Sequence, residues 1–192
     1  MISCRLPIYL ASKSPRRKKL LEQINIKFTS FSVNIKEELN DGEHPVQTVK
    51  RLAESKMKIA KNKVSDGIII TADTIVVLDN KIIGKPKNKT HAEKILKLLS
   101  GKTHFVYTGF VVLNTLTGKK ITGYSRTSVT FRKLYRDEIL DYIKSGSPMD
   151  KAGAYGIQDD FGAVFVEKIS GCYYNVVGLP LTKVYNALKE VC

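Results

Sequence analysis

The chain has 192 residues, 43% of them hydrophobic and 26% charged, and its 32 basic and 18 acidic residues give a formal net charge of +14. This composition is typical of a globular protein, and it contains no apolar run near the roughly 20 residues that a membrane-spanning helix requires. The charge makes nucleic acid a partner to consider, but most of the excess is lysine spread along the chain, whereas arginine is the preferred reader of base edges. Nucleic-acid binding is therefore not the favoured main function.

The first predicted elements alternate between strands and helices. Residues 8–11 predict a short strand, and Pro15 opens a helix that runs to about residue 23, because proline suits the first helical position. Residues 27–33 predict a second strand, and another proline opens a helix over residues 45–63.

The central part of the chain is rich in isoleucine and valine. Residues 67–72 and 75–78 predict buried strand, followed by a turn into a short strand at 81–83. Residues 90–93 match a capping box that starts a helix, and Gly101 closes it.

Further strands and helices complete the pattern. They are a hairpin of strands at 103–113 and 119–131, a helix at 136–145, a strand at 164–169, and a last helix that begins at Pro180. The pattern has no clean βαβ repeat, so we expect an α/β (mixed α+β) fold with a long mixed sheet flanked by helices. No linker or change of composition marks a boundary, and we expect a single domain over residues 1–192.

The first candidate site is the segment 13–19, which holds five cations in seven residues at the start of a helix. Each cation there is unfavourable by about 0.3–1 kcal/mol, because a helix N-terminus is itself partly positive. A bound anion such as phosphate would reverse that balance. The alternative is that these side chains extend into water.

The second candidate is Asp73, an acid within the otherwise apolar stretch 68–78. A buried carboxylate needs a cation, a metal ion or hydrogen-bond donors; alternatively, Asp73 caps a bend between two strands. Lys56 lies within the apolar stripe of the helix at 45–63. It either extends along the helix to solvent or points its ammonium into a site shared with Asp73.

Further polar residues are weaker signals. The acids Glu37, Glu38, Asp41 and Glu43 form either a solvated loop or, together with Asp73, a Mg²⁺ site. The histidines have no spacing typical of zinc ligands or a catalytic triad, and we assign no chemistry to His44, His91 or His104. The cysteines Cys4, Cys172 and Cys192 form no CxxC pair, which favours a reducing, cytoplasmic setting.

Several separated segments together resemble the Maf family of nucleoside triphosphate pyrophosphatases, also called septum-formation-inhibitor-like proteins. These segments are residues 10–17 (LASKSPRR), 72–74 (ADT), 84–86 (GKP), 99–101 (LSG), 150–158 (DKAGAYGIQ) and 175–180 (NVVGLP). The resemblance spans nearly the whole chain. It implies a fold similar to that of inosine-triphosphate pyrophosphatases, with a long, bent mixed sheet, two lobes and a central cleft.

The resemblance also implies an activity: hydrolysis of a nucleoside triphosphate to the monophosphate and pyrophosphate with a divalent metal, Mg²⁺ or Mn²⁺, as house-cleaning of nucleotide pools. Asp73 is then the proton acceptor and, with Glu37, a metal ligand. The substrate-binding residues that the resemblance implies are Ser14, Arg16, Lys56, Thr74, Lys85 and Gln158.

Residues 152–158 match the branch of the family that acts on dTTP and UTP, and Arg16, Thr74 and Gln158 match positions linked to pyrimidine choice. One departure is the connection at 159–162, which is charged where the family has a shorter, glycine-rich one. The resemblance further implies a homodimer. The alternatives are a non-catalytic nucleotide-binding regulator of cell division and septum formation, and a nucleic-acid-binding protein.

Overall fold

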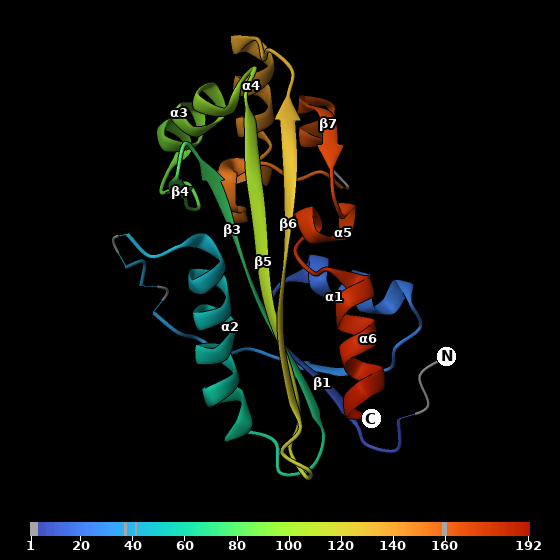
Figure 1. The fold of residues 1–192 in the computed structure, drawn as a ribbon. Helices are drawn as coiled ribbons and strands as arrows, with labels where there is room; N and C mark the ends of the chain where they lie inside the picture. Colours follow the sequence, from blue (N-terminus) through green and yellow to red (C-terminus); the bar gives the residue numbers. More distant parts are fainter. Residues whose placement is uncertain (1–3, 37, 41, 159–160) are drawn as a thin grey trace. The chain divides into compact units, whose positions relative to one another are not determined.

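The computed structural model describes residues 4–36, 38–40, 42–158 and 161–192. Its strands are β1 (Ile8–Ala11), β2 (Thr29–Phe31), β3 (Ile68–Leu78), β4 (Lys81–Ile83), β5 (Thr103–Asn114), β6 (Lys120–Phe131) and β7 (Val166–Ser170) (Figure 1). Its α-helices are α1 (Pro15–Gln23), α2 (Pro45–Lys61), α3 (Lys89–Leu99), α4 (Arg136–Lys144), α5 (Tyr173–Val177) and α6 (Leu181–Val191). Short 3-10 helices cover Ser147–Asp150, Ala152–Ala154 and Phe161–Phe165.

The strands form one mixed sheet in the order β2-β1-β3-β5-β6-β7, with β4 paired to β3. β1 is parallel to β2 and β3, whereas β4 and β7 are antiparallel to β3 and β6. The expected mixed α/β architecture, with helices flanking a mixed sheet, is confirmed. No helix in the described parts of the chain combines the length and the apolar character needed to cross a membrane.

The chain divides into two compact units. The first holds the residues up to Asp73 together with Thr108–Ser125 and Gly178–Cys192, and the second holds Thr74–Tyr107 and Arg126–Val177. β3 passes from the first unit into the second between Asp73 and Thr74.

In the first unit, α2 buries its apolar stripe against the strands. Val49, Leu52 and Ala53 are at most 1% exposed. The helix approaches the sheet closely: a Cβ at Gly109 would lie 2.4 Å from the carbonyl oxygen of Val49. Only glycine on β5 leaves room for this contact, which fixes the distance between α2 and the strands. In the view of Figure 1, α2 and α6 lie on either side of the strands of this unit.

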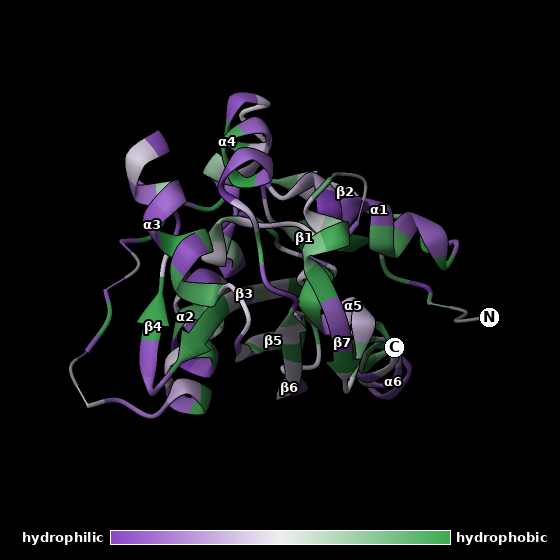
Figure 2. Cartoon of the chain, turned by 90° about the horizontal axis from the view of Figure 1, so that it is seen from above, coloured by the Kyte–Doolittle hydropathy of each residue, from purple (hydrophilic) through white to green (hydrophobic). Residues whose placement is uncertain are grey.

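In the second unit, α3, α4 and the 3-10 helices enclose an aromatic core. Phe131, Tyr155 and Phe165 form the centre of this core, where the Phe131 and Tyr155 rings pack edge to face with centroids 4.7 Å apart. In Figure 2, β3 is largely green, whereas α3 carries both hydrophilic and hydrophobic colours, as expected of a helix with one buried face.

Three local expectations are wrong. Residues 68–78 form one continuous strand, so Asp73 does not cap a bend between two strands. The second strand is shorter than predicted and spans Thr29–Phe31. The cap of α3 is Asn88, whose Oδ1 accepts from the backbone N of His91 at 2.8 Å, so the helix begins before the predicted capping box at 90–93. The short helix α5 was not expected at all.

Candidate active site

The first part of the candidate site is the start of α1. Ser14 is the N-cap, and its Oγ accepts from the backbone N of Arg17 at 3.4 Å, while Pro15 occupies the first turn. No acidic residue lies in that turn, and Arg16 is half-buried there. The predicted cluster of cations therefore does lie at the positive end of a helix.

Arg17 holds this helix start in place. Its Nε donates to the carbonyl oxygen of Gly178 at 2.8 Å, and its Nη1 donates to Oγ of Ser12 at 3.3 Å. The same Ser12 oxygen accepts from the backbone N of Ser14 at 3.2 Å. Arg17 thus joins the loop before α1 to the segment before α6, a positioning role that the sequence did not distinguish from that of the neighbouring Arg16.

The second part is an ion pair between Lys56 on α2 and Asp73 on β3. The Lys56 ammonium donates to Oδ1 of Asp73. The two side chains are only 11% and 7% exposed, so Lys56 does not extend to solvent. The hydroxyl of Thr71 donates to the carbonyl of Ala53 at 2.9 Å and fixes the helix against the strand beside the pair.

The acids that precede α2 divide into two groups. Glu43 is bound by Arg51, whose Nε and Nη2 lie 2.8 and 2.6 Å from its carboxylate oxygens, and this guanidinium lowers the pKa of Glu43. Glu38 pairs with Lys36 at 2.9 Å on the surface. Glu37 and Asp41 lie outside the described residues, so the predicted Glu37 ligand has no structural description.

The described residues form no metal cage. Among them, no group of three or more His, Cys, Asp or Glu side chains is placed to hold a metal ion. Asp73 nevertheless fits Mg²⁺ as a single carboxylate ligand, because Mg²⁺ commonly takes one or two carboxylates and completes its shell with waters and substrate phosphates.

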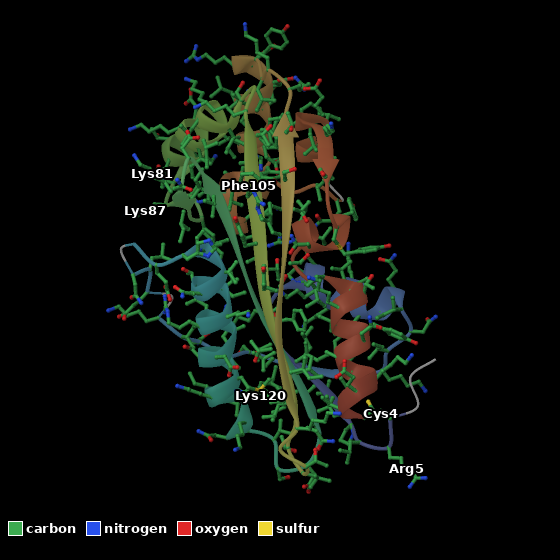
Figure 3. The ribbon with its side chains drawn as sticks, viewed as in Figure 1. Cys4, Arg5, Lys81, Lys87, Phe105 and Lys120 are labelled. Carbon is green, nitrogen blue, oxygen red and sulfur yellow. The ribbon has the colours of Figure 1, made fainter. Side chains whose placement is uncertain are left out.

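The second unit carries the other predicted residues. Thr74 is half-buried on β3, Lys85 is exposed after β4, and Gln158 is half-buried. Figure 3 shows Lys81 and Lys87 at the outer side of β4 and the segment after it, and both are exposed, so Lys85 lies within a basic stretch.

Gly153 connects the segments that carry Lys85 and Gln158. Its backbone N donates to the carbonyl of Gly84 at 3.2 Å. Its φ of +74° favours glycine, and a Cβ there would lie 3.0 Å from Cγ2 of Val76 on β3. The structure therefore holds the segment before Lys85, the segment before Gln158 and the strand of Thr74 in contact.

The fold and these clusters define a mixed α/β protein with a cationic helix start and a buried lysine–aspartate pair. The sequence matches the family described as Maf-like protein over residues 7–191, so the chain belongs to the Maf family.

Curated relatives are similar over nearly their full length. A protein of Alkaliphilus metalliredigens is 50% identical, with 95% of each chain covered, and one of Thermosipho melanesiensis is 48% identical, with 96% of this chain and 98% of the relative covered. A third, from Chlorobium phaeovibrioides, is 43% identical, with 96% and 97% covered. All three are named dTTP/UTP pyrophosphatase.

Proposed function

We propose that this chain is a nucleoside triphosphate pyrophosphatase that hydrolyses dTTP and UTP to the monophosphate and pyrophosphate. The names of its full-length relatives support the activity and the substrate class. The structural observation that carries the proposal is the Lys56–Asp73 pair, because a carboxylate that is kept from solvent and oriented by one lysine is suited to act on a single water.

In the proposed reaction, Asp73 accepts a proton from the water that attacks the α phosphorus. The new bond joins this water oxygen to the α phosphorus, and the bond from the α phosphorus to the bridging oxygen breaks. The pyrophosphate leaves with the bridging oxygen and its electron pair. Lys56 orients the Asp73 carboxylate, so the chain's contribution is largely positioning and electrostatic stabilisation.

The phosphates need positive charge and hydrogen-bond donors. In the proposal, Ser14, Arg16 and the free backbone N–H groups of the α1 start bind phosphate oxygens in the first unit, and Lys85 does so in the second. Asp73 and Glu37 would hold a divalent cation, Mg²⁺ or Mn²⁺, that arrives with the triphosphate, and when bound it would neutralise phosphate charge.

Base choice is proposed to come from Arg16, Thr74 and Gln158. The Gln158 amide offers both a donor and an acceptor, which suits the edge of a pyrimidine. A site with such groups rejects a mismatched base because its own polar atoms would then lose their partners. We further propose a cytoplasmic homodimer that removes unwanted triphosphates from the nucleotide pool.

A panel of nucleoside triphosphates, assayed for pyrophosphate with and without Mg²⁺ or Mn²⁺, tests the proposal. We expect metal-dependent turnover with dTTP and UTP preferred over purine triphosphates and 7-methyl-GTP. A purine preference would contradict the substrate class. Nucleotide binding without turnover would instead favour the non-catalytic regulator.

A further inference from the structure

His104 on β5 is an ionisable residue within the core of the second unit. Its side chain is 0% exposed, and its ring packs edge-on against Phe131 and Tyr155, with centroids 5.0 and 5.3 Å away. Nε2 lies 2.8 Å from the phenol oxygen of Tyr155, whereas Nδ1 has no hydrogen-bond partner among the described residues. Burial lowers the pKa of His104 to about 4, so the imidazole is neutral near pH 7.

Tyr155 is the hydrogen-bond partner of His104. Tyr155 is 6% exposed, and burial raises the pKa of its phenol, which stays protonated. Burying an unsatisfied polar atom costs about 1–3 kcal/mol, and Nδ1 of His104 has no partner to offset that cost. Phenylalanine at positions 104 and 155 would fill a similar volume and would bury no unpaired polar atom. The hydrogen bond between these side chains therefore provides orientation that packing alone would not supply.

The oriented segment is 153–158, which ends at Gln158. The backbone N of Gly156 donates to the phenol oxygen of Tyr142 at 3.2 Å, and Gly153 is held on Gly84 as described above. Between these anchors, Ala154 has a φ of +59°, a left-handed conformation that costs a residue with a Cβ about 1 kcal/mol or more. Surrounding contacts must hold such a backbone in place. The backbone N of Ala154 donates to the carbonyl of Lys151 at 3.1 Å, and the bond between His104 and Tyr155 holds the side chain of the next residue.

We propose that His104 is a positioning residue for base selection: by holding the Tyr155 phenol it fixes the backbone of residues 153–158 and so the Gln158 amide. The inference rests on the proposed function, in which Gln158 contacts the base. It gives a role to a histidine that no motif distinguishes.

His104→Phe keeps a ring of similar size but removes the hydrogen bond, and Tyr155→Phe removes it from the other side. We expect each to raise KM for dTTP and UTP about tenfold and to lower the preference for dTTP over dCTP about tenfold, with kcat changed less than twofold, since one lost hydrogen bond of about 1.4 kcal/mol corresponds to a factor of ten. The double variant should resemble either single variant, because both remove the same interaction. His104→Gln, which keeps an acceptor, should restore part of the preference.

Leu96→Ala is the matched control. Leu96 is fully buried in the same core, so its truncation destabilises the unit without touching the hydrogen bond. All assays are run well below the unfolding temperature of the least stable variant. We expect Leu96→Ala to keep the substrate preference and His104→Phe to lose it, with faster amide exchange over residues 153–158 in His104→Phe alone.

Two results would overturn the role of His104 without affecting the proposed function. One is that both phenylalanine variants keep the wild-type preference for dTTP over dCTP. The other is that Leu96→Ala loses this preference as much as His104→Phe does. A wild-type protein that hydrolyses no triphosphate would overturn the proposed function and the role of His104 with it.

Discussion

The Lys56 ammonium donates to the Asp73 carboxylate, and so joins the middle of α2 to the residue of β3 at which the chain leaves the first compact unit. The pair depends on features that lie elsewhere in the sequence. Gly109 lets the backbone of α2 approach β5, and Thr71 bonds the helix carbonyl of Ala53. The position of the proposed reactive carboxylate is thus set by packing around it as well as by its own partner.

Asp73→Asn tests the role of this carboxylate. The amide keeps the shape and an oxygen acceptor for Lys56 but is a far weaker base, so turnover of dTTP should fall by about 10²–10⁴-fold, the usual contribution of a general base. Pyrophosphate release measures the loss, and circular dichroism checks that the fold is kept. Near-normal turnover in the folded variant would remove Asp73 from the chemistry.

Lys56→Met tests the energetic role of the pair. Methionine fills similar space but leaves a carboxylate that is 7% exposed without this cation, so the free energy of unfolding should fall by about 3 kcal/mol in urea titrations. Lys58→Met, on an exposed position of the same helix, should change it by less than about 0.5 kcal/mol.

The double variant Lys56→Met with Asp73→Asn should lose less stability than the sum of the two single variants, because the second change removes the charge that the first leaves unpaired. Additive losses would show that the two groups do not interact in solution.

Arg17→Lys tests the anchor of the α1 start. Lysine cannot reproduce two directed donations to Gly178 and Ser12, so we expect a loss of about 2 kcal/mol in unfolding free energy and a higher KM for dTTP. Lys19→Ala, at an exposed position of the same helix, serves as the control. An unchanged unfolding free energy and KM in Arg17→Lys would mean that Arg17 acts only through its charge, which lysine keeps.

His104 gives the protein a defined pH dependence of stability. Its pKa is about 4 in the folded protein against an ordinary value of 6.5, so below pH 6.5 the unfolded state binds a proton that the folded state does not. This contribution to stability is therefore present above pH 6.5 and is lost as the pH falls toward 4, by about 2 kcal/mol between pH 7 and 5.

Urea unfolding at pH 7, 6 and 5 measures this loss as the difference between wild type and His104→Gln. We expect the difference to change with pH in that window, whereas His91→Gln, at a half-buried position in the first turn of α3, should follow the wild type. Parallel curves for wild type and His104→Gln would show that the imidazole charges freely in the folded protein.

Local chemistry explains which elements could be predicted. Pro15 and Pro45 each mark a helix start that the structure confirms. The cap at Asn88 was missed because Thr90 offered a competing capping box two residues later, whereas in the structure the Asn88 side chain accepts from the backbone N of His91.

The candidate site was predictable as residue types but not as contacts. Asp73 stood out because a charge in an apolar strand needs a partner, and the sequence offered Lys56 as one of several partners. His104 and Tyr155 gave no such signal, since a histidine and a tyrosine on a strand are ordinary in sequence, and their bond spans segments brought together only by the tertiary fold.

In the proposed reaction, water attacks the α phosphorus of a pyrimidine triphosphate with the help of Asp73. Hydrolysis of dTTP in water labelled with heavy oxygen, followed by mass spectrometry of both products, tests this step. We expect label in dTMP and none in pyrophosphate, and we expect Asp73→Asn to form both products far more slowly. Label in the pyrophosphate, or release of dTDP and orthophosphate, would contradict it.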